Sequence, residues 1–307
     1  MNILEKLLQN HPIRRTDSQK QAFRDYVQSH CAKNGMPCEV VDVENNKNIV
    51  IGNPKTAKIL LTAHYDTPAM SLFPNMLIPK NTFFRLLYHL SYPVLLAFAA
   101  LAVSYGITAL IGNEAVWVPL YLVLYLGSFY LLTRTFVNPS NANDNTSGVA
   151  TVLSIVSKMA DKLTEKGIAC ILFDNEEKGL KGSKAFAKQY KGQLNDTLVL
   201  NFDCVGDGDH ILFVAKPKAD QNPLYHAIKE ALSQRQEKTT VFLSAKQASC
   251  NSDQKNFEQG VGIVACHRRP IIGYVAGKIH TRRDTVCDQS NVDALVSSFV
   301  SLFESTL

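Results

Sequence analysis

Short apolar runs alternate with amphipathic segments along most of the chain. The clearest strand is predicted at Ile168–Phe173, an unbroken apolar run of the kind that lies at the buried centre of a sheet. The clearest helix has apolar residues at Val149, Val152 and Val156, which share one face of a helix with 3.6 residues per turn. The pattern therefore predicts a sheet whose strands are connected by helices.

The same criteria give a set of predicted elements for the whole chain. Strands are expected near residues 39–51, 58–63, 168–173, 198–202, 211–215, 240–243 and 262–266. Helices are expected near residues 17–32, 147–166, 180–190, 222–235, 253–259 and 291–305, and residues 1–35 should form two helices. This alternation predicts an α/β fold with a mixed, mostly parallel sheet sandwiched by helices.

One long segment departs from the alternation. Residues 86–111 and 115–133 contain no Asp, Glu, Lys or Arg, and the first stretch is long enough to span a bilayer core. A polar turn, Gly112-Asn113-Glu114, separates the two stretches, and aromatic residues lie near their ends, as is typical of membrane interfaces. We interpret residues 71–137 as an inserted transmembrane hairpin. The alternative is a lid or dimer arm on a soluble protein.

Charge at the ends of the hairpin predicts its orientation. Lys80, Arg85 and Arg134 flank the two stretches, whereas the turn carries only Glu114. Positive residues favour the cytoplasmic side of a membrane. We therefore expect a multi-pass protein of the cell membrane that contacts the bilayer through residues 86–133. The rest of the chain, residues 1–70 and 138–307, is expected to form one domain that faces the cytoplasm.

Polar residues follow several of the predicted strands. His64 and Asp66 come after the strand at 58–63, Glu176 and Glu177 after the strand at 168–173, and Asp203 after the strand at 198–202. The carboxyl ends of parallel strands meet at one edge of a sheet, where α/β proteins bind their ligands. Two further residues of the same type, Asp144 and His280, precede a helix and lie in a loop, respectively. Imidazole with carboxylate suits zinc.

Each of these residues also has an ordinary structural explanation. A histidine after a strand is usually a hydrogen-bonded loop residue, and a Glu-Glu pair often starts a solvated helix. The string Asp144–Gly148 is rich in residues that cap helices. The conjunction of all of them at strand ends favours a metal site over these separate explanations.

The order of the motifs resembles that of the co-catalytic di-zinc aminopeptidases of the bacterial leucyl aminopeptidase type, a family that also contains the glutaminyl-peptide cyclotransferases. The matching strings are His64-Tyr65-Asp66, Asp144-Asn145-Thr146-Ser147-Gly148, Glu176-Glu177-Lys178-Gly179-Leu180-Lys181-Gly182-Ser183, Asn201-Phe202-Asp203 and His280-Thr281. They cover residues 1–70 and 138–307, and the hairpin has no counterpart in soluble members of the family.

The resemblance implies a role for each matching residue. Asp144 would bridge two zinc ions, with His64 and Asp203 completing one ligand set and Glu177 and His280 the other. Glu176 would be the general base, and Asp66 would orient the imidazole of His64. A cis peptide often follows the bridging aspartate in this family. Cobalt or manganese could take the place of zinc.

Composition narrows the expected partners and the compartment. The net charge is a modest +5, and no basic patch interleaved with aromatic residues argues for nucleic acid. The seven cysteines form no CxxC pair, which favours reduced thiols in the cytoplasm. The first residues predict a short charged amphipathic helix rather than a signal peptide.

The resemblance and the hairpin together suggest a membrane-anchored, zinc-dependent aminopeptidase that acts on peptides with a free N-terminus. Two alternatives stay open. One is a glutaminyl cyclase that uses a single zinc ion, and the other is a catalytically inactive membrane scaffold with the same fold. The number of tightly bound zinc ions, two, one or none, would separate the three.

Overall fold

The computed structural model describes residues 1–233 and 238–306, whose strands form one mixed sheet with the order β1-β2-β4-β3-β5-β8-β6-β7, β9 pairing with β8. The strands are β1 (Cys38–Val43), β2 (Asn46–Ile51), β3 (Ile59–His64), β4 (Ile168–Phe173), β5 (Leu198–Phe202), β6 (His210–Ala215), β7 (Thr239–Ser244), β8 (Gly260–Arg269) and β9 (Gly273–Val275). Every residue of β3, β4 and β5 is buried. These apolar strands therefore lie at the centre of the molecule, as their sequences predicted.

Strand direction changes across the sheet. The centre is parallel, through the pairs β3–β4, β3–β5 and β5–β8, and β6 and β7 are also parallel. The pairs β1–β2, β2–β4, β6–β8 and β8–β9 are antiparallel. The predicted mixed sheet is confirmed, but parallel pairs are not in the majority among the described strands.

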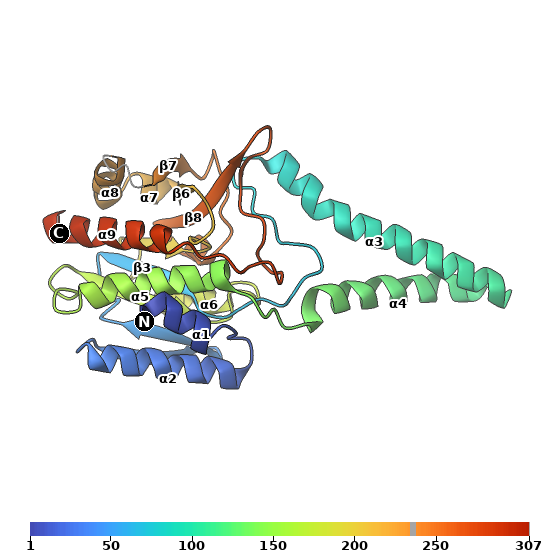
Figure 1. The fold of residues 1–307 in the computed structure, drawn as a ribbon, viewed down its shortest axis with the longest axis horizontal. Coiled ribbons are helices and arrows are strands. Elements are labelled where there is room, and N and C mark those ends of the chain that lie inside the picture. Colours follow the sequence, from blue (N-terminus) through green and yellow to red (C-terminus); the bar gives the residue numbers. More distant parts are fainter. Residues whose placement is uncertain (234–237, 307) are drawn as a thin grey trace.

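Helices cover both faces of the sheet (Figure 1). They are α1 (Ile3–Asn10), α2 (Asp17–Lys33), α5 (Gly148–Lys158), α6 (Lys181–Gln189), α7 (Pro217–Asp220), α8 (Pro223–Ser233) and α9 (Gln289–Thr306). Apolar residues of α1, α2, α5, α8 and α9 share one core with the sheet, whereas Phe186 of α6 belongs to a second core on the other face. The two predicted N-terminal helices are present, and Asn2 and Thr16 begin them with capping boxes.

Several predicted boundaries were wrong. The strand expected at 39–51 is a hairpin, β1 and β2, because Glu44 and Asn45 turn the chain with φ of 51° and 62°. The helix expected at 147–166 ends at Lys158, and the one expected at 253–259 is a short 3-10 turn, Asp253–Asn256. Residues 234 and 235 of the helix expected at 222–235 lie outside the described residues.

The two long apolar helices project from the sheet as a hairpin (Figure 1). They are α3 (Thr82–Ile111) and α4 (Trp117–Tyr130), joined by a 3-10 turn at Glu114–Val116, and a π-helical turn, Leu131–Thr135, follows α4. Length and composition would allow both helices to cross a membrane, and only 17% of the apolar stretch of α3 and 0% of that of α4 is buried. The ends of the insertion meet in an antiparallel bridge between Ala69 and Val137.

Small residues on one face of α3 allow the two helices to pack closely. Ala100, Ser104 and Thr108 recur every fourth residue, and they are the buried residues of a helix that is otherwise exposed or half-buried. Close approach through small side chains is typical of helix pairs in lipid. The hairpin is therefore a packed unit, although it lies outside the core of the sheet.

Candidate metal centre

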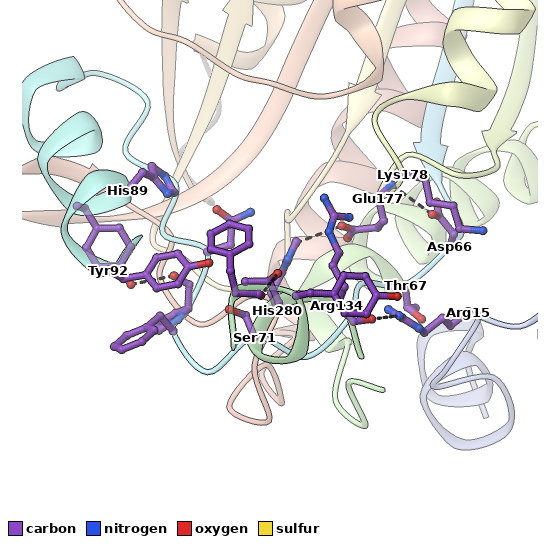
Figure 2. Close-up of a pocket in the computed structure, with 18 of the residues that line it drawn as sticks. Arg15, Asp66, Thr67, Ser71, His89, Tyr92, Arg134, Glu177, Lys178 and His280 are labelled. Carbon is purple, nitrogen blue, oxygen red and sulfur yellow. Dashed lines mark hydrogen bonds and ion pairs between the residues drawn. The ribbon is translucent and has the colours of Figure 1, made fainter. Parts of the chain in front are cut away.

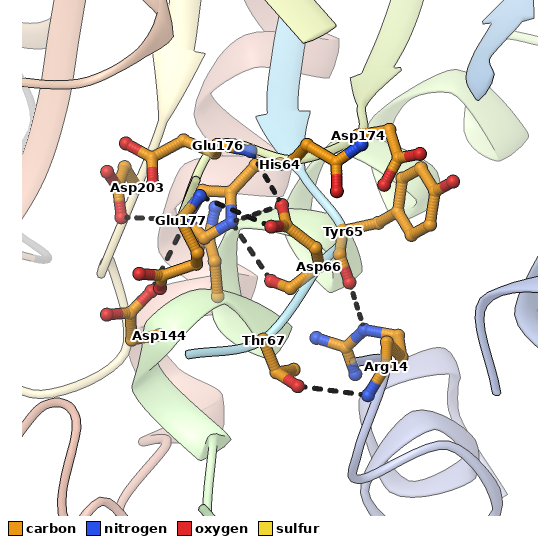
Figure 3. Close-up of polar contacts among 12 residues, drawn as sticks. Arg14, His64, Tyr65, Asp66, Thr67, Asp144, Asp174, Glu176, Glu177 and Asp203 are labelled. Atoms are coloured by element: carbon orange, nitrogen blue, oxygen red, sulfur yellow. Dashed lines mark hydrogen bonds and ion pairs between the residues drawn. The ribbon is translucent and has the colours of Figure 1, made fainter. Parts of the chain in front are cut away.

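The candidate ligands come from neighbouring parts of the fold. His64 ends β3, the Glu176-Glu177 pair follows β4, and Asp203 follows β5; these three strands are adjacent and parallel. Asp144 lies in the irregular turn Ala142–Ser147 before α5, and His280 lies in the loop after β9. Most of these side chains point into one space beyond the strand ends, as Figure 3 shows.

Two sets of three side chains meet at Asp144. Nε2 of His64 lies 3.3 Å from Oδ1 of Asp144 and 3.6 Å from Oδ1 of Asp203. Nε2 of His280 lies 3.1 Å from Oδ2 of Asp144 and 3.4 Å from Oε2 of Glu177. In each set the three donor atoms lie within 4.8 Å of one another. The five residues that the sequence singled out are thus brought together, and their role as metal ligands stays a prediction.

The two histidines face more negative charge than they can balance. Burial alone would lower the pKa of His64, but Glu176, Asp144 and Asp203 outweigh it and hold this pKa well above its usual value. The same holds for the pKa of His280, which burial lowers and which Glu177 and Asp144 raise. A site with this electrostatic profile favours a positively charged occupant.

The donor set fits divalent metal ions of the zinc type. Imidazole nitrogens and carboxylate oxygens are common zinc ligands, and three protein ligands per ion leave a position for water or substrate. Both oxygens of Asp144 face a histidine, one each from the two sets, as a bridging carboxylate requires. The predicted ligands therefore fit two ions that share Asp144.

Glu176 occupies a different position from Glu177. It groups with His64 and Glu177 but belongs to neither of the two sets that share Asp144. Desolvation raises the pKa of Glu176 well above its usual value, the nearby His64 opposes the shift, and Glu177 adds to it. A carboxylate with a raised pKa can take and release a proton near neutral pH.

Asp66 binds the backbone amides of the glutamate pair and belongs to neither of the two donor sets. Its side-chain oxygens accept hydrogen bonds from the amides of Glu176 at 3.0 Å and Glu177 at 3.2 Å. Its backbone carbonyl accepts from Nδ1 of His64 at 3.1 Å, and Oδ1 lies 3.5 Å from the same nitrogen. Burial would raise the pKa of Asp66, but His64 holds it below its usual value. Asp66 therefore fixes both the imidazole and the turn that carries the two glutamates.

Arg14 is a residue that no local sequence signal indicated. This guanidinium is fully buried, and it donates to the carbonyls of Tyr65 at 2.5 Å and His11 at 2.6 Å and to the hydroxyl of Thr146 at 3.1 Å. Burial lowers the pKa of Arg14 to about 10, although the carboxylates Asp66 and Asp144 oppose the shift. Its place behind the acidic cluster depends on the packing of the loop between α1 and α2.

Asp284 is a second residue that sequence reasoning missed. Its oxygens accept from the amides of Asn143 at 2.8 Å and Asp144 at 3.0 Å. Burial, and then the charge of Asp144, raises the pKa of Asp284 to about 7. Because it lies four residues after His280, Asp284 ties the loop of one candidate ligand to the turn of another.

The backbone around the site is unusual at several candidate positions. His280 itself, Cys204 next to Asp203, and Asn175 next to Glu176 have φ of 62°, 59° and 55°. Left-handed conformations are rare for residues other than glycine and cluster at functional sites. The peptide bond between Asp144 and Asn145 is cis, as the resemblance implied.

The sequence profile of Peptidase family M28 matches residues 132–299, which are 168 of the 307 residues. No curated protein sequence is significantly similar to the chain.

Several solved structures share the fold. A Zn-dependent exopeptidase from Parabacteroides distasonis is 14% identical, with a TM-score of 0.58 over 99% of this chain and 95% of that one. The LapA aminopeptidase of Legionella pneumophila is 15% identical, with a TM-score of 0.56 over 100% of this chain and 70% of that one. Macrostomum lignano glutaminyl cyclase is 12% identical, with a TM-score of 0.55 over 99% and 89%. These likenesses show the fold.

Proposed function

We propose that this chain, which belongs to peptidase family M28, is a membrane-anchored, zinc-dependent aminopeptidase. The observation that carries the proposal is the arrangement of two donor sets around Asp144, with Glu176 beside them and outside both. A carboxylate that two metal ions can share, with a free carboxylate nearby to take a proton, suits two-metal hydrolysis of an amide.

Each candidate ligand has a place in the proposal. His64 and Asp203 would hold one zinc ion, Glu177 and His280 the other, and Asp144 both. When bound, zinc supplies Lewis acidity toward the scissile carbonyl and lowers the pKa of a nearby water.

Glu176 is the proposed general base. Its carboxylate takes a proton from the attacking water and delivers it to the leaving amine as the peptide bond breaks. Asp66 keeps Glu176 in place through the amide of that residue, to which Oδ1 accepts at 3.0 Å.

Membrane anchoring through α3 and α4 is the second part of the proposal. Both helices expose large apolar side chains, such as Leu110 at 90% and Val123 at 70%, which in water would favour aggregation. Insertion into a bilayer removes this surface from water. Lys80, Arg85 and Arg134 at the root of the hairpin favour a cytoplasmic catalytic domain.

The test is release of free amino acid from a panel of unblocked peptides in detergent, by zinc-loaded wild-type enzyme and by Glu176→Gln. We expect rapid release by the wild type and a rate lower by about 10²–10⁴-fold in the variant, the usual contribution of a general base. Both proteins should bind the same amount of zinc, because Glu176 is not a proposed ligand. Near-normal turnover by the variant at full zinc content would rule out Glu176 as the base.

A cyclase activity is the second candidate, since the fold is shared with a glutaminyl cyclase. Peptides that begin with glutamine distinguish the two activities: an aminopeptidase releases glutamine, whereas a cyclase yields a pyroglutamyl peptide of unchanged length. Zinc stoichiometry gives an independent answer. Two ions per chain support the aminopeptidase, one ion supports the cyclase, and none supports an inactive scaffold.

A further inference from the structure

A cavity of about 1170 Å³ connects the candidate metal centre to the hairpin. At one end it is lined by Asp66, Glu177 and His280, and at the other by side chains of α3 and α4, among them Leu95 and Leu126. Figure 2 shows Glu177 and Asp66 on one side of His280 and the α3 residues His89 and Tyr92 on the other. The site therefore opens toward the two helices.

The segment that leads into the hairpin is hydrogen-bonded both to the loop of His280 and to the far end of the hairpin. The amide of Ser71 donates to the carbonyl of His280 at 2.7 Å, and the amide of Met70 donates to the carbonyl of Phe136 at 2.8 Å. Farther on, the hydroxyl of Tyr88 in α3 donates to the carbonyl of Pro74 at 2.8 Å. Both ends of the hairpin are thus fixed relative to a candidate metal ligand.

The hairpin end of the cavity is mostly aromatic and apolar, with His89, Ser91 and Thr133 as polar side chains in its lining. The ring of Tyr92 lies 5.2 Å from that of Phe73 and stacks on that of Phe129 at 5.9 Å, with an angle of 11° between the planes. Beyond these rings, Leu95 and Leu126 line the cavity and are 63% and 60% exposed. An apolar wall of this kind, left open, fits an apolar occupant.

Helix geometry places this wall at membrane depth. At 1.5 Å per residue, Leu95 lies about 24 Å from the turn at Ile111, and Leu126 lies about 18 Å from Glu114 along α4. A hydrocarbon core is about 30 Å thick, so both leucines lie within it when the turn reaches the far surface. The catalytic end of the cavity, which also contains Arg15, Arg134 and Lys178, then lies on the headgroup side.

We propose that the cavity is a lateral entrance for peptides that partition into the bilayer. The inference rests on the proposed aminopeptidase function. The free amino end of such a peptide would reach Glu177 and His280, while its apolar part stays between α3 and α4. A membrane-bound peptide exchanges places there with lipid acyl chains, so its apolar part never crosses water. The substrate class is thus a peptide with a polar amino end and an apolar remainder.

The test compares two substrates with the same amino end. One is a short peptide amide with the first residue preferred in the panel, and the other carries a C-terminal dodecyl amide. Both are given to zinc-loaded enzyme in vesicles of phosphatidylcholine with a minor share of phosphatidylglycerol. We expect the wild type to hydrolyse both and to prefer the tailed peptide. Because partitioning alone concentrates the tailed peptide, the decisive comparison is between variants in the same vesicles.

Leu126→Trp fills the hairpin end of the cavity without touching the candidate ligands. We expect kcat/KM for the tailed peptide to fall by about tenfold, which corresponds to about 1.4 kcal/mol of lost apolar contact. Hydrolysis of the short amide should be unchanged. The matched control is Val123→Trp on the same helix, because Val123 is 70% exposed and does not line the cavity. It should leave both substrates unaffected.

A photo-crosslinking measurement tests the same point without turnover. A tailed peptide with a benzophenone at the end of its tail is bound to zinc-loaded Glu176→Gln enzyme in vesicles and illuminated. We expect attachment within residues 88–95 and 126–133, and competition by the unlabelled tailed peptide at lower concentrations than by the short amide. This measurement does not use Leu126→Trp, so it remains informative if that variant folds poorly.

The outcomes separate the inference from the function on which it rests. An unchanged preference for the tailed peptide in Leu126→Trp, with no attachment to α3 or α4, overturns the lateral entrance and leaves the aminopeptidase standing. The cavity would then be filled by lipid alone. If the wild type hydrolyses neither peptide, the proposed function fails, and the lateral entrance as a substrate route falls with it.

Discussion

One buried arginine partly offsets the negative charge of the candidate metal centre. Four carboxylates, Asp144, Glu176, Glu177 and Asp203, converge beyond the strand ends, and Arg14 lies behind them with no exposed surface. A buried guanidinium is costly to desolvate, yet this one has partners for its nitrogens and lies in the field of two acidic residues. Arg14 therefore stabilises the acidic cluster as well as the loop between α1 and α2.

Replacing Arg14 should destabilise the whole domain. In Arg14→Met, three acceptors lose their donor and the carboxylates lose a counter-charge, so we expect the free energy of unfolding to fall by about 3–5 kcal/mol. Thermal unfolding in detergent measures the change. The neighbouring variant Arg15→Met is the control, because within the described residues the Arg15 side chain makes a single hydrogen bond, an exposed one to the carbonyl of Arg134. Equal unfolding temperatures for the two variants would contradict the structural role of Arg14.

At the scale of elements, the start of α5 is packed against the end of β5. The side chain of Asn145 donates to the carbonyl of Phe202 at 2.9 Å and accepts from the amide of Cys204 at 3.2 Å. At Gly148, a methyl group would lie 2.2 Å from the oxygen of Phe202. Only glycine permits this close approach, which sets the distance between Asp144 and Asp203.

Gly148→Ala should therefore impair the site through the packing of two elements. Relief of the clash moves α5 away from β5, and overpacking of this kind costs about 1–3 kcal/mol of stability. A displacement of about 1 Å at a reacting group can cost about 10²-fold in rate. Peptide hydrolysis and unfolding temperature should both fall. Gly106→Ala in α3, where nothing lies within 4 Å of the added methyl group, should change neither.

The elements differed in how well the sequence predicted them. The buried strands β3, β4 and β5 were predicted within about one residue, because an apolar run bounded by polar residues needs no distant contact to be recognised. The turn at Glu44 and Asn45 was missed, since neither residue is a glycine or a proline. β2 pairs with β1 along its whole length, and its last three residues, Ile49–Ile51, also pair with β4, which is far away in sequence.

At the scale of the whole molecule, the hairpin is inserted between two candidate ligands. His64 precedes it and Asp144 follows it, so both ends of the hairpin must return to the same side of a membrane. The bridge between Ala69 and Val137 closes this loop at its root. If α3 and α4 cross a bilayer, the sheet domain and the turn at Glu114 lie in different compartments.

Labelling with a membrane-impermeant maleimide tests this topology. The seven cysteines all lie outside residues 71–137, so the wild type reports only on the catalytic domain. In intact cells we expect no labelling of the wild type and strong labelling of Glu114→Cys, which places the new thiol in the turn. Opened membranes should allow labelling of both. Labelling of the wild type in intact cells would show that the catalytic domain faces outward. If neither the wild type nor Glu114→Cys were labelled until the cells were opened, the hairpin would not span the membrane.

The sequence by itself determined the layers of the fold and the apolar hairpin, and it supplied the candidate zinc ligands. These features depend on local sequence. Apolar runs form buried strands, apolar residues at helical spacing form helices, and histidine and carboxylate side chains can bind metal ions. Only the tertiary structure decided that Arg14 and Asp284 support Asp144, and that the candidate site opens toward α3 and α4. Such contacts join residues far apart along the chain, and they form only when the sheet, the loops and the hairpin pack together.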